Sequence, residues 1–139
     1  MIKTARAIIK IDNEYIFMKR VKKSEEGLYT YYATLGGHLE KNETFEEAVI
    51  REIYEESNLK CKVEKLFMEI ESKDINRYEK IYLASVISGI PSNGSGEEFS
   101  DKVDFEKYGS FEIVKLNKKE LERYNILPKE LKEKMIKEL

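Results

Sequence analysis

The sequence contains few residues that could support thiol or imidazole chemistry. It has one cysteine and one histidine among 139 residues. A single cysteine excludes a disulfide bond within the chain. Because no second cysteine supports redox chemistry, we expect Cys61 to be a small packing residue and not a nucleophile.

Long apolar runs and an excess of one charge are also missing. No run approaches the roughly 18 apolar residues that span a bilayer, and the first residues, MIKTARAIIKID, lack the apolar core of a secretion signal. We therefore expect a soluble, cytoplasmic protein. A net charge of −2 and a pI near 5.7 give no general attraction to nucleic acid or to an anionic membrane. A polyanionic ligand would have to be attracted by a metal ion or by local Lys and Arg side chains.

The length and composition indicate one globular domain covering residues 1–139. An apolar content of 41% is typical of a globular protein, and a chain of this length buries about two-thirds of the surface that it exposes when unfolded. We find no repeat, linker or low-complexity segment that would divide it.

Hydrophobic periodicity predicts strands on both sides of one long helix. Residues 22–27 are expected to be a charged loop, and residues 89–100 a loop rich in Gly, Ser and Asn. Strands are expected at 5–11, 15–21, 29–35, 65–71, 78–88 and 111–116, with 78–88 a central strand buried on both faces. Helices are expected from Thr44 to about Asn58, at 117–124, and from Pro128 to the end of the chain.

The acidic stretch GHLEKNETFEEAVIREIYEESNL, residues 37–59, is the most informative part of the sequence. In a helix, Glu52, Glu55 and Glu56 stand at i, i+3 and i+4, so their side chains can converge on one point. Carboxylates that close would repel one another unless a cation lies among them. Oxygen ligands alone suit a hard divalent ion, Mg²⁺ or Mn²⁺.

The ends of this helix are also marked in the sequence. Thr44 and Glu47 have the spacing of a capping box at the N-terminus. Asn58 stands where the helix should stop, and asparagine is a common substitute for glycine in the left-handed conformation there. Before the helix, Gly36 and Gly37 predict a sharp turn at which the backbone approaches another group closely.

Taken together, Gly37, Glu43, Arg51, the three glutamates and Leu59 resemble the Nudix box of the Nudix hydrolase family. Asn58 departs from the pattern, which has glycine there, and Leu35 stands where a proline often precedes the glycines. The resemblance implies an α+β fold, an α/β/α sandwich with a mixed, partly barrel-like sheet. It also implies metal-dependent hydrolysis of a diphosphate bond in a nucleoside diphosphate derivative or nucleoside triphosphate, with water attacking phosphorus.

The resemblance further implies a role for each matching residue. Glu52, Glu55, Glu56 and the backbone carbonyl of Gly36 would be metal ligands. Arg51 would orient the catalytic carboxylates. Gly37 and Glu43 would support the turn between loop and helix.

The general base remains open between Glu52 and the pair Glu97 and Glu98. We favour Glu98 as an extra ligand or base, because a loop after the central strand can close over a cleft. The alternative to a catalytic role for Glu97 and Glu98 is that they form the solvated end of a loop. His38 and Glu97 are weaker candidates for substrate contact, and His38 has a structural or solvent-facing role as its alternative.

Other polar and aromatic residues gave weaker signals. Tyr31, Tyr32 and Tyr82 are expected to be packing residues more often than walls for a nucleobase. Lys19, Arg20 and Arg77 are either cations that attract phosphate or ordinary surface charges.

Two classes of function therefore stand. The first is a Nudix-type pyrophosphohydrolase that acts on a small nucleotide. The second is a catalytically silent Nudix-like domain with a nucleotide-binding or regulatory role. The intact set of box carboxylates argues against this second class. The sequence predicts neither a polymeric nucleic acid partner nor a membrane partner, and it leaves a homodimer open.

Overall fold

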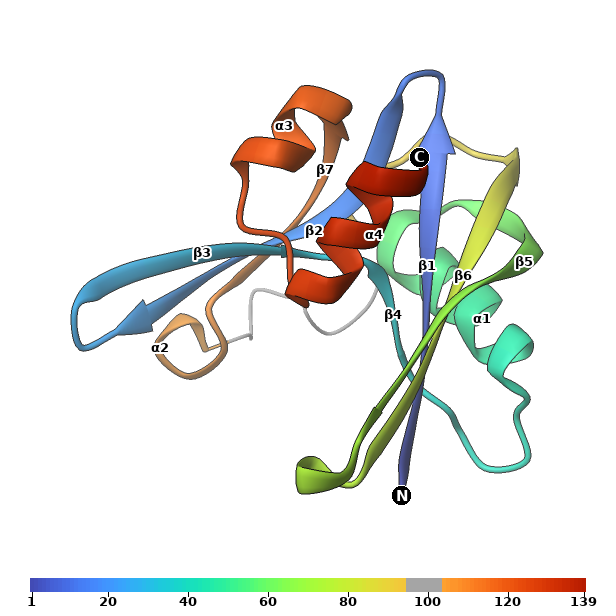
Figure 1. The fold of residues 1–139 in the computed structure, drawn as a ribbon, viewed down its shortest axis with the longest axis horizontal. Coiled ribbons are helices and arrows are strands. Elements are labelled where there is room, and N and C mark those ends of the chain that lie inside the picture. The colour runs from blue at the N-terminus through green and yellow to red at the C-terminus, as the bar shows by residue number, and fades with distance from the viewer. Residues whose placement is uncertain (95–103) are drawn as a thin grey trace.

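The chain folds around one mixed β-sheet that has helices on both faces (Figure 1). The computed structural model describes residues 1–94 and 104–139. Its elements are β1 (Ile2–Ile11), β2 (Glu14–Ser24), β3 (Gly27–Ala33), β4 (Leu35–His38), α1 (Phe45–Ser57), β5 (Lys60–Ser72), the 3-10 helix η1 (Lys73–Ile75), β6 (Arg77–Ser88), α2 (Phe105–Tyr108), β7 (Ser110–Asn117), α3 (Lys118–Arg123) and α4 (Lys129–Glu138). The expected α+β sandwich is confirmed.

The sheet is mixed because one of its pairings is parallel. Its seven strands include the path β3-β2-β1-β6-β5, while β4 pairs with β1 and β7 pairs with β2. Strands β1 and β6 run parallel, and the other pairs are antiparallel. As Figure 1 shows, β5 and β6 form a long ribbon that has η1 at its tip.

Strand β1 divides the core, because its successive side chains point to opposite faces of the sheet. Ala5, Ala7 and Ile9 pack with α1 on one face, and Ile8 belongs to the cluster on the other face. That second cluster includes apolar residues of α3 and α4, namely Leu121, Leu131 and Met135. Helix α1 is thus separated from α3 and α4 by the sheet, which gives the three layers of the sandwich.

The predicted ends of helix α1 are confirmed. The Thr44 hydroxyl accepts from the amide of Glu47 at 3.1 Å, and the Glu47 carboxylate accepts from the amide of Thr44 at 3.0 Å. At the other end Asn58 adopts the left-handed conformation, with φ of 63°. A stripe of Ala48, Val49 and Ile53 is buried, which fixes which face of α1 meets the sheet.

The C-terminal helices also follow the sequence prediction. Asn117 is the N-cap of α3, with Glu120 completing a capping box. Pro128 precedes α4, which buries Leu131 and Met135. No helix within residues 1–94 or 104–139 is both long enough and apolar enough to cross a bilayer.

Several expected boundaries were wrong, because strand pairing overrode local composition. Residues 22–27 are not a loop: β2 and β3 stay paired up to Ser24 and Gly27, so backbone hydrogen bonds extend a charged hairpin that composition alone would end. The predicted burial of β6 on both faces fails at its end, where Ile87 is 60% exposed. The separate strand β4 and the short helices η1 and α2 were not predicted.

Candidate active site

The acidic face of α1 meets the two glycines of β4 across a short gap. Strand β4 pairs with β1, so that Gly36 lies opposite Arg6 and Gly37 opposite Ala5. Gly36 has φ of +146°, and a Cβ on it would lie 2.1 Å from the carbonyl oxygen of Ala5. Only glycine fits this position, because its φ is positive and its backbone touches β1. The predicted sharp turn was wrong, since both glycines lie within strand β4.

Gly37 leaves room for the carboxylate of Glu52. A Cβ at Gly37 would lie 2.8 Å from the carboxyl carbon of Glu52 and 2.9 Å from each of its oxygens. The predicted close approach at the glycine pair is therefore confirmed, and the group that approaches Gly37 is a predicted metal ligand. Any side chain at Gly37 would displace that carboxylate.

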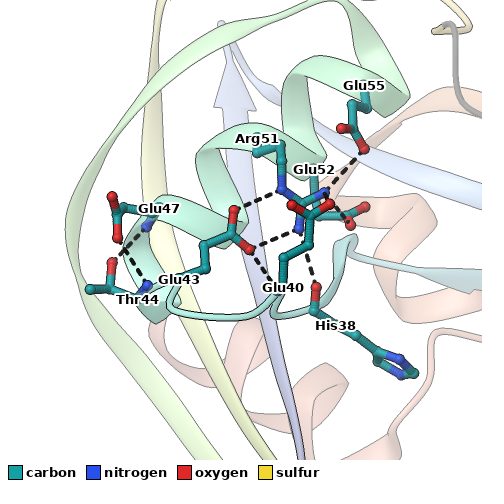
Figure 2. A network of polar contacts seen from close by, with 8 residues as sticks. All are labelled: His38, Glu40, Glu43, Thr44, Glu47, Arg51, Glu52 and Glu55. Atoms are coloured by element: carbon teal, nitrogen blue, oxygen red, sulfur yellow. Dashed lines mark hydrogen bonds and ion pairs between the residues drawn. The ribbon is translucent and has the colours of Figure 1, made fainter.

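Arg51 is the centre of a network of carboxylates (Figure 2). Its Nε donates to Glu43 Oε2 at 2.8 Å, and its Nη2 donates to Glu43 Oε1 at 2.9 Å, a two-point contact. Its Nη1 donates to Glu52 Oε1 at 2.9 Å and to Glu55 Oε2 at 3.2 Å. Arg51 thus contacts Glu52 and Glu55 together, while Glu43 contacts Arg51 at two points.

The electrostatics of the network reinforce this geometry. Hydrogen bonding from Arg51 holds the pKa of the Glu43 carboxyl below its ordinary value, and the amide of Glu40 adds a further hydrogen bond. The contact with Glu43 in turn raises the pKa of Arg51. Both side chains are therefore charged at neutral pH, and each stabilises the charged form of the other.

Glu56 faces a different donor. Its Oε1 accepts from the backbone amide of Gly36 at 2.8 Å. The prediction that Glu52, Glu55 and Glu56 converge on one point is thus met for Glu52 and Glu55, which share Arg51 Nη1. Glu56 does not complete a group of three with them among the described residues, and its carboxylate accepts from the amide of β4.

The donor chemistry of this face fits a hard divalent cation, although the side chains do not form a closed cage. Every side chain predicted as a ligand offers carboxylate oxygens, the donors that Mg²⁺ and Mn²⁺ prefer. Among the residues that the structure describes, no group of three acidic, His or Cys side chains lies close enough to hold a metal ion. The carboxylates are instead oriented by Arg51 and by the amide of Gly36.

A cavity of about 780 Å³ opens beside Gly36 and Glu56. Its walls come from all seven strands β1 to β7, the end of α1, η1 and the start of α4. Arg6 and Glu79 form an ion pair of 2.7 Å there, and Arg6 also donates to the carbonyl of Thr34 at 2.9 Å. The site thus joins an acidic helix face to a cavity that has a polar wall.

Sequence reasoning missed Arg6, Thr34 and Glu79 as residues of this wall. The available signal was a charged residue within each of two apolar strands, since Arg6 interrupts β1 and Glu79 lies in β6. Glu79 is only 8% exposed, and a buried acid needs a partner. That partner is 73 residues away in the chain, so it cannot be read from local spacing.

The remaining predicted site residues are distributed as follows. The His38 ring is exposed and points away from the carboxylates (Figure 2), while its backbone carbonyl accepts from Arg51 at 3.2 Å. The ring lines a second hollow of about 520 Å³ next to Lys3 and Glu43. Glu97 and Glu98 lie outside the described residues.

The aromatic and cationic residues that were weaker candidates lie in the core or at the cavity. Tyr82 packs beneath α1, as predicted, and Tyr32 stacks on Tyr124 with ring centres 5.2 Å apart. Arg20 and Arg77 line the cavity together with Tyr31. Cys61 is buried, and burial raises the pKa of its thiol to about 11, so it is a packing residue.

The family follows from a match that spans almost the whole chain. The model of the NUDIX domain matches residues 1–129. The chain belongs to the NUDIX family. The family resemblance drawn from residues 37–59 is therefore confirmed.

Solved NUDIX structures share this fold at low sequence identity. A structure described as MutT from Aliivibrio salmonicida and Vibrio cholerae superposes with a TM-score of 0.72 at 17% identity, covering 99% of this chain and 98% of that one. A NUDIX hydrolase from Clostridium perfringens gives 0.69 at 20% identity, over 98% of this chain and 93% of that one. At these identities the likeness shows the fold alone.

A curated relative is similar over a short segment only. The NAD-capped RNA hydrolase NPY1 of Saccharomyces cerevisiae is 48% identical over 40 residues. That segment is 29% of this chain and 10% of the relative's length, so the chain spans only a small part of that protein.

Proposed function

We propose that this NUDIX enzyme hydrolyses a diphosphate bond in a nucleoside diphosphate derivative or nucleoside triphosphate, in a reaction that depends on Mg²⁺ or Mn²⁺. The observation that carries the proposal is the position of the box carboxylates beside the cavity. Glu56 and Gly36 line that cavity, and Arg51 holds Glu52 and Glu55 on the adjacent part of α1. Carboxylates that could hold a metal ion for the diphosphate thus lie next to a space for the group attached to it.

Glu52, Glu55 and Glu56, with the carbonyl of Gly36, would hold the metal ion. Mg²⁺ held there would supply positive charge to offset the negative charge of a diphosphate and would make a bound water molecule more acidic. Within the chain, Arg51 keeps Glu52 and Glu55 oriented, and Glu43 keeps Arg51 in place by its two-point contact.

The general base is Glu52 or Glu98. Glu52 is held by Arg51, which lowers its freedom to rotate and favours a fixed ligand. We therefore retain Glu98 as the favoured base or extra ligand, with Glu97 beside it as a substrate contact. His38 is the weakest candidate for substrate contact, because its ring points away from the carboxylates (Figure 2).

The cavity favours a substrate that carries a polar group beyond the diphosphate. Arg6, Glu79 and Thr34 offer hydrogen-bond donors and acceptors at its wall. Similar folds include an ADP-ribose pyrophosphatase from Streptococcus suis and a UDP-X diphosphatase. Both names describe nucleoside diphosphates joined to another group, so this class is where the search for a substrate should begin. We place this reaction in the cytoplasm, with a small nucleotide as the ligand and a homodimer open.

The test is a panel of nucleoside triphosphates and nucleoside diphosphate derivatives, with Mg²⁺ and with Mn²⁺, read as phosphate release with and without an added phosphatase. We expect turnover that chelation abolishes. Glu55→Gln and Glu56→Gln should lose more than the roughly 10–100-fold that the loss of a supporting residue costs.

Glu46→Gln is the matched control, because it makes the same change in the first turn of the same helix. It should keep wild-type turnover. Full activity in Glu55→Gln and Glu56→Gln would show that the ligands are assigned wrongly. No metal-dependent turnover across the whole panel would instead favour a catalytically silent binding domain.

A further inference from the structure

The end of α1 is covered by a short segment that follows strand β6. Residues 92–94 lie against the last turn of this helix, which carries Glu55 and Glu56. The Ser92 amide donates to the carbonyl of Ser57 at 3.1 Å, and the Gly94 amide donates to the carbonyl of Glu56 at 3.0 Å. The last carbonyls of a helix have no partner within the helix, so residues 92–94 supply hydrogen bonds that the end of α1 needs.

Asn58 ties this segment to the helix through its side chain. Its Nδ2 donates to Ser92 Oγ at 2.7 Å and to the carbonyl of Asn93 at 3.1 Å. Its own amide donates to the carbonyl of Tyr54 at 2.9 Å, which closes the helix. Asn58 is also the position at which the box departs from glycine. Glycine would satisfy the backbone as well, but it has no side chain to reach residues 92–94.

Gly94 lies directly against the backbone of the helix. A Cβ on it would lie 1.8 Å from the carbonyl oxygen of Glu55 and 2.7 Å from the carbonyl carbon of Glu56. Both atoms belong to backbone and cannot rotate away. A side chain at position 94 would therefore force residues 92–94 off the helix.

The segment is held on its other side by strand β7. The side-chain oxygen of Asn93 accepts from the amide of Ile113 at 3.0 Å. Strand β7 is itself paired along its length with β2. Residues 92–94 thus link the acidic end of α1 to the sheet that forms the far wall of the cavity, and we call them the clamp segment.

We propose that Asn58 is a positioning residue that fixes the clamp segment on the end of α1 and thereby orients Glu55 and Glu56. It touches no reacting group and acts only through the helix end. The catalytic consequence rests on the proposed function above, whereas the physical link between Asn58 and the clamp segment does not. In this chain asparagine stands where the box pattern has glycine, and its side chain makes the hydrogen bonds to the clamp segment.

The test compares Asn58→Gly with Asn76→Gly. Asn76 is left-handed too, with φ of 52°, and it ends the 3-10 helix η1 far from α1. Both changes relieve the same backbone strain, but only Asn58→Gly removes hydrogen bonds to the clamp segment. We expect hydrogen exchange at the Ser92 and Gly94 amides to quicken by at least about 2- to 10-fold in Asn58→Gly, the factor for one of the two hydrogen bonds that are lost. It should stay unchanged in Asn76→Gly.

Turnover supplies the second readout. We expect kcat to fall by a similar factor, about 2- to 10-fold, in Asn58→Gly, while KM stays within about twofold of wild type, because the cavity walls are not altered. Gly94→Ala should lower kcat at least as much. The double variant should lose little more than Gly94→Ala alone, since both changes release one segment.

Unchanged exchange at Ser92 and Gly94 in Asn58→Gly would overturn the proposal, and so would faster exchange with unchanged kcat. If Asn76→Gly lowered kcat as much as Asn58→Gly does, the effect would be a general property of left-handed asparagines. That result would also overturn the proposal. If wild-type protein hydrolyses nothing on the panel, the proposed function fails. Exchange at the two amides then decides by itself whether Asn58 holds the clamp segment.

Discussion

Arg51 shows how one side chain organises this site at the residue scale. Its guanidinium contacts Glu43 through Nε and Nη2, and it contacts both Glu52 and Glu55 through Nη1, which its flat, forked shape permits. A lysine could not make these contacts together. The spacing of the sequence indicated that these residues belong together, but the sharing of Nη1 between Glu52 and Glu55 is visible only in the structure.

The pair of Glu43 and Arg51 leads to a prediction on stability and pH. Glu43→Gln should lower the free energy of unfolding at pH 7 by about 1.5–3 kcal/mol, the range for hydrogen bonds to charged groups. The pKa of Glu43 is lower in the folded protein than its ordinary value of 4.5. Its contribution is therefore fully present above pH 4.5 and is lost as the pH falls through the lower folded pKa.

Urea denaturation of wild type and Glu43→Gln at several pH values measures this effect. The difference between the two proteins should shrink as the pH falls below 4.5. Glu106→Gln is the control, since the ion pair of Glu106 with Lys23 is well exposed and should matter little. A difference that grows on acidification would contradict the assignment.

Helix α1 combines strong local signals with one tertiary contact at the scale of an element. Its caps follow from residues within one or two turns of each end, and both were predicted correctly. The contact of its last turn with residues 92–94 was not predicted. Nothing in the helix sequence indicates which distant segment will satisfy its last carbonyls.

The capping box gives a prediction at this scale. Thr44→Ala removes the hydroxyl that accepts from the Glu47 amide, and it should lower the free energy of unfolding by about 1 kcal/mol. Asn117→Ala makes the matching change in the capping box of α3, on the other face of the sheet. Chemical denaturation should show losses of similar size for both variants. No loss for Thr44→Ala would mean that solvent replaces the cap at no cost.

At the scale of the whole molecule, one sheet carries two cores. The cluster beneath α1 and the cluster beneath α3 and α4 share the strands β1, β2 and β6. A shared sheet should make both clusters unfold together, which is the physical content of the prediction that residues 1–139 form one domain.

Ile53→Ala and Leu131→Ala test this prediction, since the residues are fully buried in opposite clusters. Each should lower the free energy of unfolding by about 2–5 kcal/mol, and each should shift one common transition. Ile90→Ala is the control, because Ile90 is 82% exposed. Two separate transitions, one moved by each variant, would show that the clusters are independent.

The sequence by itself determined the features that depend on short spacing. Positions three and four apart on a helix fix which side chains share a face, so the acidic face of α1 could be predicted, and capping residues marked the ends of the helix. The resemblance of residues 37–59 to the Nudix box indicated the family. The glycines of β4 were predicted as a close approach, but not the carboxylate that approaches.

Only the tertiary structure decided the cavity wall and the clamp segment. Arg6 and Glu79 become a pair because β1 and β6 run parallel in one register, and Asn58 meets Ser92 because β6 returns the chain to the end of α1. Such contacts depend on how strands pair over long separations, and the same local sequence is compatible with many pairings. The register of the sheet, and not the composition of any segment, brought these residues together.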